Sequence, residues 1–176
     1  MTVDGGFTAF ISLGSNIGDK AMYCRMGIAG LAADRRTVIT GRSPFYRTEP
    51  VDYTDQEWFV NAVVRIHTLL DPFALLTLIG AIERGAGRDR TGVRFGPRTL
   101  DMDILFFDDR IIDTPELTVP HPRMHKRRFV LQPLCDIDPA IVHPVFRRHV
   151  RYLLDHLDDE GQEIFPYDDP GGAPLP

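Results

Sequence analysis

Two carboxylates separated by a single residue are the most chemically suggestive feature of the sequence. They are Asp101 and Asp103, in the run Leu-Asp-Met-Asp-Ile-Leu-Phe-Phe over residues 100–107. The run alternates as a strand does, so we expect both acids to project from one face. Same-face residues on a strand lie roughly 6.5 Å apart, which lets the carboxylates converge on two divalent cations about 3.5 to 4 Å apart. Oxygen ligands alone suit magnesium carrying phosphates better than zinc.

Arginines stand close to this acid pair. The Gly-Pro turn at residues 96–97 sets Arg98 beside the acids, and Arg94 lies in the preceding loop. A guanidinium group binds phosphate oxygens bidentately and stays charged. Two acids on a strand more often mark a solvated face, but Leu105 and Phe107 continue this face as apolar residues. The chain has no Gly-x-x-x-x-Gly-Lys-Ser/Thr loop, so a metal with arginines is the expected way to neutralise phosphates.

Alternating strands and helices must position these groups. The pattern predicts strands at residues 7–13 and 59–68, an extended stretch at 37–46, helices at 19–33, 71–84, 123–134 and 146–157, and the acid-bearing strand. No crossover pattern repeats regularly, which favours an α+β fold with helices packed on a mostly antiparallel sheet. The first helix presents Met22, Met26, Ala29 and Ala33 at helical spacing, and we expect that face to be buried.

Two features near this framework fit a ligand. Phe59 and Asn61 share one side of the strand at 59–68, and an amide beside an aromatic ring suits a flat, hydrogen-bonding heterocycle. The loops at 47–57 and 85–96 are long and polar, and lengths of this kind are typical of functional loops. The second loop carries Arg88, Arg90 and Arg94 and is interpreted as a lid over phosphates.

Length and composition narrow the class of protein. The chain has 176 residues, of which 43% are hydrophobic and 26% charged, and we expect one domain at 1–160 followed by a flexible, acidic, Pro/Gly-rich tail at 161–176. A net charge of −5 argues against nonspecific nucleic-acid binding. Cys24 and Cys135 are far apart and show no metal-binding spacing. With no apolar N-terminal run, these features predict a cytoplasmic protein without membrane attachment, and we expect a monomer.

The run Arg-Phe-Gly-Pro-Arg-Thr-Leu-Asp-Met-Asp-Ile at residues 94–104 resembles the signature of the 6-hydroxymethyl-7,8-dihydropterin pyrophosphokinase family of folate biosynthesis. Four further segments match in the family's order, at Ser12–Asn16, Tyr46–Pro50, Phe59–Ala62 and Val119–Met124. The resemblance covers about residues 7 to 146. It implies a ferredoxin-like three-layer α/β/α fold and transfer of diphosphate from ATP to 6-hydroxymethyl-7,8-dihydropterin, giving AMP. It also implies two Mg²⁺ ions per active site, with ATP as co-substrate.

The resemblance also implies roles for individual residues. Asp101 and Asp103 would bind the metal, and Arg88 and Arg98 would act with them as catalytic residues on the ATP phosphates. Further nucleotide contacts fall on Glu83, Thr118, His121 and Arg127. Pterin contacts fall on Gly14, Thr48, Val51, Phe59, Asn61, Phe95 and Phe129, with Phe59 and Phe129 on either side of the ring.

Some positions depart from the family pattern. Asp52 stands where the family often has glycine, Phe95 replaces a frequent tryptophan, and Glu116 and His125 occupy positions that can be basic. Two other functions fit parts of the sequence. A nucleotidyltransferase could use the same acids but would not release AMP, and an RNA-binding module on a ferredoxin-like sheet would need basic and aromatic residues rather than an acid pair.

Overall fold

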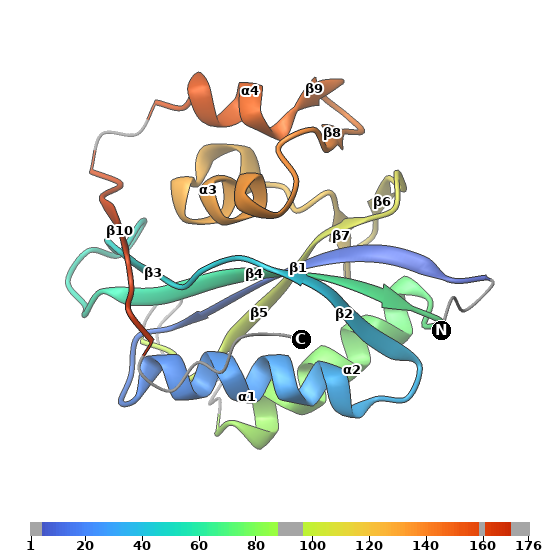
Figure 1. Cartoon of the computed structure of the whole chain (residues 1–176), viewed down its shortest axis with the longest axis horizontal. Helices are drawn as coiled ribbons and strands as arrows, with labels where there is room; N and C mark the ends of the chain where they lie inside the picture. Colours follow the sequence, from blue (N-terminus) through green and yellow to red (C-terminus); the bar gives the residue numbers. More distant parts are fainter. Residues whose placement is uncertain (1–4, 88–96, 159–160, 170–176) are drawn as a thin grey trace.

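One antiparallel sheet separates two helical layers (Figure 1). The structure is a computed structural model that describes residues 5–87, 97–158 and 161–169. Its sheet has the strand order β10-β3-β4-β1-β5, and β2 also pairs with β4. These strands are β1 (Phe7–Ser15), β2 (Thr37–Arg42), β3 (Tyr46–Thr48), β4 (Phe59–Thr68), β5 (Asp101–Phe107) and β10 (Ile164–Pro166). The expectation of a mostly antiparallel sheet is confirmed.

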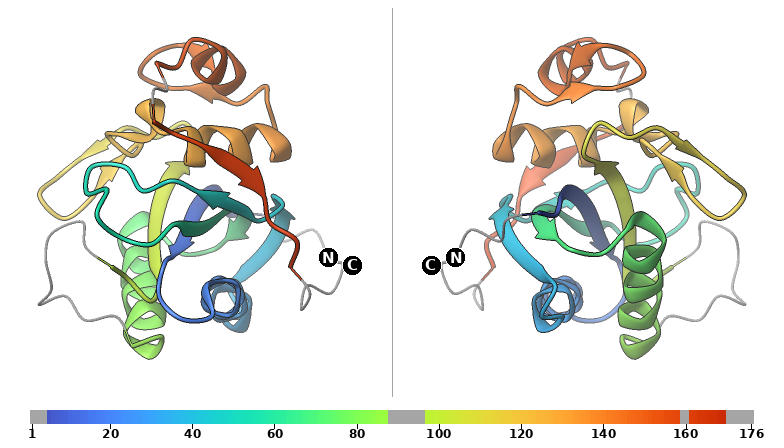
Figure 2. Two further views of the ribbon diagram at one scale, coloured as in Figure 1. Left: turned by 90° about the vertical axis from the view of Figure 1, so that its left-hand side faces the viewer. Right: turned by 90° about the vertical axis from the view of Figure 1, so that its right-hand side faces the viewer.

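Helices cover both faces of the sheet (Figure 2). One layer holds α1 (Lys20–Ala33) and α2 (Pro72–Gly85), and the other holds α3 (Arg128–Ile137) and α4 (Val150–Asp155). The units β1-α1-β2 and β4-α2-β5 each leave room for one strand between their own two strands, which is the arrangement of a ferredoxin-like fold. The predicted fold class is therefore confirmed. Short elements complete the chain at β6 (Ile112–Asp113), β7 (Thr118–Val119), η1 (Met124–Lys126), β8 (Val142–His143) and β9 (Arg148–His149).

The two predicted helix starts are confirmed by their caps. The Asp19 carboxylate accepts a hydrogen bond from the backbone N–H of Met22. The Asp71 carboxylate accepts from the N–H groups of Phe73 and Ala74, and proline follows at the first helical position. Such side-chain acceptors satisfy N–H groups that have no partner within the helix.

The predicted buried face of α1 is wrong. Met22 and Met26 are 37% and 42% exposed, while Cys24, Ile28 and Leu31 are buried. Apolar residues occur all round this helix, so their spacing does not single out one face. The buried face is instead the one where the helix backbone comes close to the sheet, because a Cβ at Gly27 would stand 2.7 Å from the side chain of Leu13.

A register shift between β1 and β5 corrects one detail of the acid-bearing strand. Ile11 pairs with Ile104, but Phe10 pairs with Phe106, so the alternation changes side at Leu105. Phe106 therefore packs with Leu105 in the cluster under α3 and α4, and Phe107 packs in the cluster over α1 and α2. The sequence predicts the opposite for these two aromatic residues, because a β-bulge leaves no mark in a regular alternation.

Residues 164–169, within the expected tail, make defined contacts with the domain. Ile164–Pro166 pairs with β3 at the edge of the sheet, and Phe165 stacks on Trp58 with ring centroids 6.0 Å apart. Arg25 of α1 then binds the carboxylate of Asp169. The last part of the predicted tail, residues 170–176, lies outside the described residues. No helix in the ranges that the structure describes is both long and apolar enough to cross a membrane.

Candidate active site

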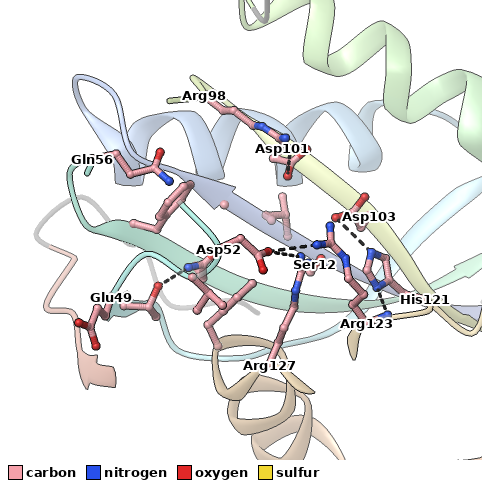
Figure 3. A pocket seen from close by; sticks show the side chains of 17 residues that line it. Ser12, Glu49, Asp52, Gln56, Arg98, Asp101, Asp103, His121, Arg123 and Arg127 are labelled. Carbon is pink, nitrogen blue, oxygen red and sulfur yellow. Dashed lines mark hydrogen bonds and ion pairs between the residues drawn. The ribbon is translucent and has the colours of Figure 1, made fainter. Parts of the chain in front are cut away.

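A recess of about 200 Å³ opens on the face of the sheet that carries α3 (Figure 3). Three neighbouring strands form its floor. Their contributions are Ser12 and Gly14 from β1, Phe59 and Asn61 from β4, and Asp101 and Asp103 from β5. Gly14 pairs with Asn61 on one side and with Asp101 on the other, and Ser12 pairs with Asp103. The strand ladder thus brings the predicted ring-binding and metal-binding residues into one site.

The two acids share a face, as predicted. The side chains that alternate with them, Leu100, Met102 and Ile104, are buried in the opposite core. Although 41% of the Asp103 side chain is exposed, the recess removes much of its bulk water. This burial, together with the nearby charge of Asp101, raises the pKa of Asp103 to about 7. A divalent cation would relieve the repulsion between these two carboxylates.

Arg98 is beside the acids, again as predicted. Its Nη1 lies 2.5 Å from Asp101 Oδ2. Asn16 holds the backbone of Arg98 by two hydrogen bonds. The Asn16 side-chain oxygen accepts from the Arg98 backbone N–H at 2.8 Å, and the Asn16 backbone N–H donates to the Arg98 carbonyl at 3.1 Å. The side-chain NH₂ group of Asn16 donates to Gln56 Oε1 and to the backbone carbonyl of Glu57. Asn16 therefore connects the arginine to the loop that follows β3.

His121 lines the recess next to Asp103, with Nε2 3.8 Å from Asp103 Oδ2. Its Nδ1 accepts from the backbone N–H of Arg123 at 3.2 Å. Burial and the neighbouring Arg127 and Arg123 lower the pKa of His121 to about 4. At neutral pH the ring is therefore uncharged, and because Nδ1 is an acceptor, its proton is on Nε2 and faces the recess.

Two further arginines meet one acid across the mouth of the recess. Asp52 Oδ2 lies 3.1 Å from Arg123 Nη1 and 3.4 Å from Arg127 Nη2 (Figure 3). Asp52 has a φ of 73°, a left-handed conformation that glycine adopts most easily. This agrees with the glycine that the family often has here. Arg127 also lies over the ring of Phe129, with its Cζ 5.4 Å from the ring centroid.

The other end of the recess is aromatic and amide-rich. Asn61 Nδ2 donates to Thr48 Oγ1 at 2.6 Å, and both residues are buried. A Cβ at position 14 would stand 2.4 Å from Asn61 Oδ1, so Gly14 leaves the space in which this amide lies. Phe59 and Phe129 reach the recess from the sheet and from α3, which are different layers. A flat ring would fit between two such walls.

Most of the site residues expected from the sequence meet in this recess: Gly14, Thr48, Val51, Phe59, Asn61, Arg98, Asp101, Asp103, His121, Arg127 and Phe129. Two nucleotide assignments do not. Glu83 is 2% exposed, and its carboxylate accepts a hydrogen bond from the backbone N–H of Met102 on β5. Within the described residues, β5 is an edge strand of the sheet. Thr118 lies in the β6–β7 hairpin and does not line the recess. Arg88, Phe95 and most of the expected lid lie outside the described residues.

Six lining residues were given no role from the sequence: Ser12, Leu13, Glu49, Asp52, Gln56 and Arg123. Ser12 had a readable signal, because it alternates with Gly14 on the same strand face. Arg123 lies inside a segment that resembles the family but was given no role. The places of Glu49 and Gln56 depend on the path of a loop without period, which sequence reasoning does not define.

The acid pair fits a hard divalent cation. Both side chains offer only oxygen, and burial together with the charge of Asp101 raises the pKa of Asp103. No group of three or more His, Cys, Asp or Glu side chains among the described residues could hold a metal ion. Two carboxylates are nevertheless enough for Mg²⁺, which keeps several waters and takes its remaining ligands from substrate phosphates.

Comparison with known sequences gives one consistent answer. Residues 10–139 match the family model of 7,8-dihydro-6-hydroxymethylpterin-pyrophosphokinase. The chain is 50% identical over 129 residues to the 2-amino-4-hydroxy-6-hydroxymethyldihydropteridine pyrophosphokinase of Bacillus subtilis, covering 73% of this chain and 77% of that protein. It is 41% identical over 155 residues to the protein of the same name from Methylorubrum extorquens, covering 88% and 96%.

Some relatives are much longer than this chain. The chain is 36% identical over 157 residues to the folic acid synthesis protein fol1 of Schizosaccharomyces pombe but spans only 21% of it. Among solved structures, wild-type HPPK-DHPS of Plasmodium falciparum matches with a TM-score of 0.66 at 17% identity, covering 88% of this chain and 45% of that one. At this identity the structural match shows the fold alone.

Proposed function

Because the chain belongs to the 7,8-dihydro-6-hydroxymethylpterin-pyrophosphokinase family, we propose that the recess is where it transfers diphosphate from ATP to the pterin alcohol with the help of Mg²⁺. The enzyme class and the overall reaction follow from the family. The metal, the number of ions and the roles of individual residues are the proposal. The observation that carries it is the meeting, over three adjacent strands, of an aromatic and amide-lined end with a pair of carboxylates flanked by arginines.

In the proposed reaction, the oxygen of the pterin hydroxymethyl group forms a bond to the β-phosphorus of ATP. The bond from that phosphorus to the oxygen bridging the α-phosphate breaks, and AMP leaves. We assign the hydroxyl proton to a carboxylate of the Asp101 and Asp103 pair. Bound Mg²⁺ would neutralise phosphate charge and polarise the transferring group.

The chain's own residues would bind, orient and neutralise the substrates. Phe59 and Phe129 would stack on the two sides of the pterin ring, and Asn61 and Thr48 would bind its polar edge. Arg98, Arg127 and the assigned Arg88 would spread the charge of the phosphates. The neutral His121 would donate a hydrogen bond from its Nε2–H to a phosphate oxygen without adding charge. Most of the rate enhancement would then come from orientation and electrostatic stabilisation.

We also propose that the protein is cytoplasmic and monomeric. Cys24 and Cys135 are both free and buried, which is consistent with the reducing cytoplasm. A monomer remains our proposal for the oligomeric state.

The test is to incubate metal-stripped protein with ATP and the pterin alcohol, with and without added Mg²⁺, and to separate the nucleotides. We expect AMP to form only when the metal and the pterin are both present. Formation of ADP, or turnover without added metal, would refute the proposed chemistry. A nucleotidyltransferase would instead release diphosphate and keep the AMP on its acceptor.

A further inference from the structure

Gln162 holds the backbone on both sides of Arg127. Its Oε1 accepts a hydrogen bond from the N–H of Arg128 at 2.9 Å, and its Nε2 donates to the carbonyl of Lys126 at 3.1 Å. One amide side chain from the C-terminal segment thus contacts the residue before the arginine and the residue after it. None of the assigned site residues lies in this segment.

The position of Arg127 explains why such support is needed. Arg127 is the N-cap of α3, with extended backbone angles (φ −126°, ψ 107°), and its side chain makes no capping hydrogen bond. The first N–H groups of a helix need acceptors from elsewhere, and arginine has only donors. Gln162 supplies an acceptor for the first of these groups. The arginine can therefore occupy the cap position while its guanidinium lines the recess.

Gln162 is itself held by the sheet. The backbone carbonyl of the next residue, Glu163, accepts a hydrogen bond from the backbone N–H of Glu49 at 2.9 Å. The backbone N–H of Glu163 donates to Glu49 Oε2 at 3.2 Å. Ile164–Pro166 then pairs with Tyr46–Thr48. The chain here crosses from the α3/α4 layer over the sheet edge to α1 (Figure 1).

We propose that Gln162 is a positioning residue for nucleotide binding, acting through Arg127. The inference rests on the proposed role of Arg127 at the phosphates. Both side-chain hydrogen bonds that the structure describes for Gln162 go to the backbone next to this arginine, and Gln162 itself does not line the recess. Its loss should therefore weaken the nucleotide interaction and leave the pterin interaction unchanged.

The first experiment compares Gln162→Ala and Gln162→Met in the full chain. The methionine variant keeps the length of the side chain but removes both hydrogen bonds, so it separates hydrogen bonding from packing. Calorimetry with a non-hydrolysable ATP analogue and Mg²⁺ should show about five- to tenfold weaker binding for both variants, with the KM for ATP raised in parallel. The KM for the pterin should stay within about twofold of wild type, a difference worth only about 0.4 kcal/mol.

Gln132→Ala is the matched control. Gln132 also presents a side-chain amide beside α3, but it donates to Asp136 within the same helix and does not line the recess. Its removal should leave nucleotide binding unchanged. Thermal unfolding of every variant shows whether it is folded at the assay temperature, and a general loss of stability would weaken binding of both substrates instead of one.

The second experiment combines these changes with Arg127→Ala. If Gln162 acts through the arginine, Gln162→Ala should add no further loss in the Arg127→Ala background, because interacting residues give non-additive effects. Additive losses would overturn the inference. If Arg127→Ala weakens nucleotide binding but both Gln162 variants bind normally, the inference fails and the proposed role of Arg127 stands. If Arg127→Ala has no effect, both fail.

Discussion

Asn16 and Arg98 hold each other by two hydrogen bonds: the Asn16 side chain accepts from the Arg98 N–H at 2.8 Å, and the Asn16 N–H donates to the Arg98 carbonyl at 3.1 Å. Asn16 lies in the segment after β1 and is 2% exposed. It is therefore the buried link between the segment Ser12–Asn16 and the arginine beside the acids. The pairing explains how a turn 82 residues away in sequence positions a proposed catalytic group.

Asn16→Ala should lower both stability and turnover. It leaves the Arg98 N–H and the Glu57 carbonyl without their partner, which should cost about 2 to 4 kcal/mol of unfolding free energy, and it frees Arg98 to move. Denaturant unfolding and steady-state kinetics measure the two effects. Ser15→Ala is the control, because the buried Ser15 hydroxyl has no hydrogen-bond partner among the described residues. Equal behaviour of the two variants would contradict the role of Asn16.

Asp52→Asn should tighten nucleotide binding. The Asp52 carboxylate lies against Arg123 and Arg127, in the place where phosphate oxygens would bind, so it must move when the nucleotide enters. The pair with Arg123 is exposed on both sides, and such a pair is worth about 0 to 1 kcal/mol, which predicts up to about a fivefold lower Kd for an ATP analogue by calorimetry. Asp55→Asn, in the same loop but outside the recess, should have no effect. Weaker binding in Asp52→Asn would count against this interpretation.

Asp103→Asn should separate activity from stability. If Asp103 binds the metal as proposed, turnover should fall by about a thousandfold or more, because a metal ligand contributes several kcal/mol to the transition state. The folded-state pKa of about 7 lies above the ordinary value of 3.8, so the stability linked to this group is lost as the pH rises through 7. At pH 8 without metal, the variant should therefore unfold at a higher temperature than wild type. A lower melting temperature with full activity would refute both statements.

Gly14→Ala should weaken pterin binding selectively. The new methyl group would meet Asn61 Oδ1 at 2.4 Å and displace the amide proposed to bind the polar edge of the ring. Equilibrium binding of the pterin should weaken by about tenfold or more, since a buried hydrogen-bonding group would be misplaced, and ATP-analogue binding should not change. Gly85→Ala serves as control because a Cβ there meets open space. Unchanged pterin affinity in Gly14→Ala would remove Gly14 and Asn61 from the proposed site.

His143 should make the protein less stable at acidic pH. Burial, with a smaller contribution from His125, lowers the pKa of His143 to about 4, and its Nδ1 accepts from the N–H groups of Val145 and Phe146. The folded-state pKa lies below the unfolded value of about 6.5. The associated stability, on the order of 2 kcal/mol, is therefore present above pH 6.5 and is lost as the pH falls towards 4.

Thermal unfolding between pH 7 and pH 4 measures this dependence. His143→Asn keeps an acceptor but cannot take up the proton, so its melting temperature should fall less steeply with pH than that of wild type. His156→Gln, which alters an exposed histidine at the end of α4, should keep the wild-type slope. Parallel slopes for wild type and His143→Asn would contradict the assignment.

The sequence predicts the local part of the site well. The shared face of Asp101 and Asp103 follows from strand alternation, and the starts of α1 and α2 follow from their capping residues. The positions of Phe106 and Phe107 do not, because the register shift arises from the pairing of β5 with β1. The buried face of α1 is also set by its partners, since its apolar residues occur all round the helix.

The long-range part of the site was not predictable in the same way. The contacts of Asp52 with the two arginines join segments 71 and 75 residues apart, and they depend on how two loops fold over the sheet. Glu83, which the resemblance assigns to the nucleotide, is buried on α2, and its carboxylate accepts a hydrogen bond from a backbone N–H of β5. The Gln162 contacts lie in a segment that composition alone marks as unstructured.

Because β1 lies between β4 and β5, the sheet fixes the distance between the two ends of the proposed site. Phe59 and Asn61, two of the residues proposed to hold the ring, stand on β4. Those proposed to hold the metal stand on β5, two interstrand spacings or about 9.6 Å away. Loops can open and close without altering that interval, because the backbone ladder maintains it. A pterin whose hydroxyl group stands on a longer side chain would place its oxygen beyond the phosphorus. The enzyme should therefore discriminate among pterins by the length of this side chain as well as by ring chemistry.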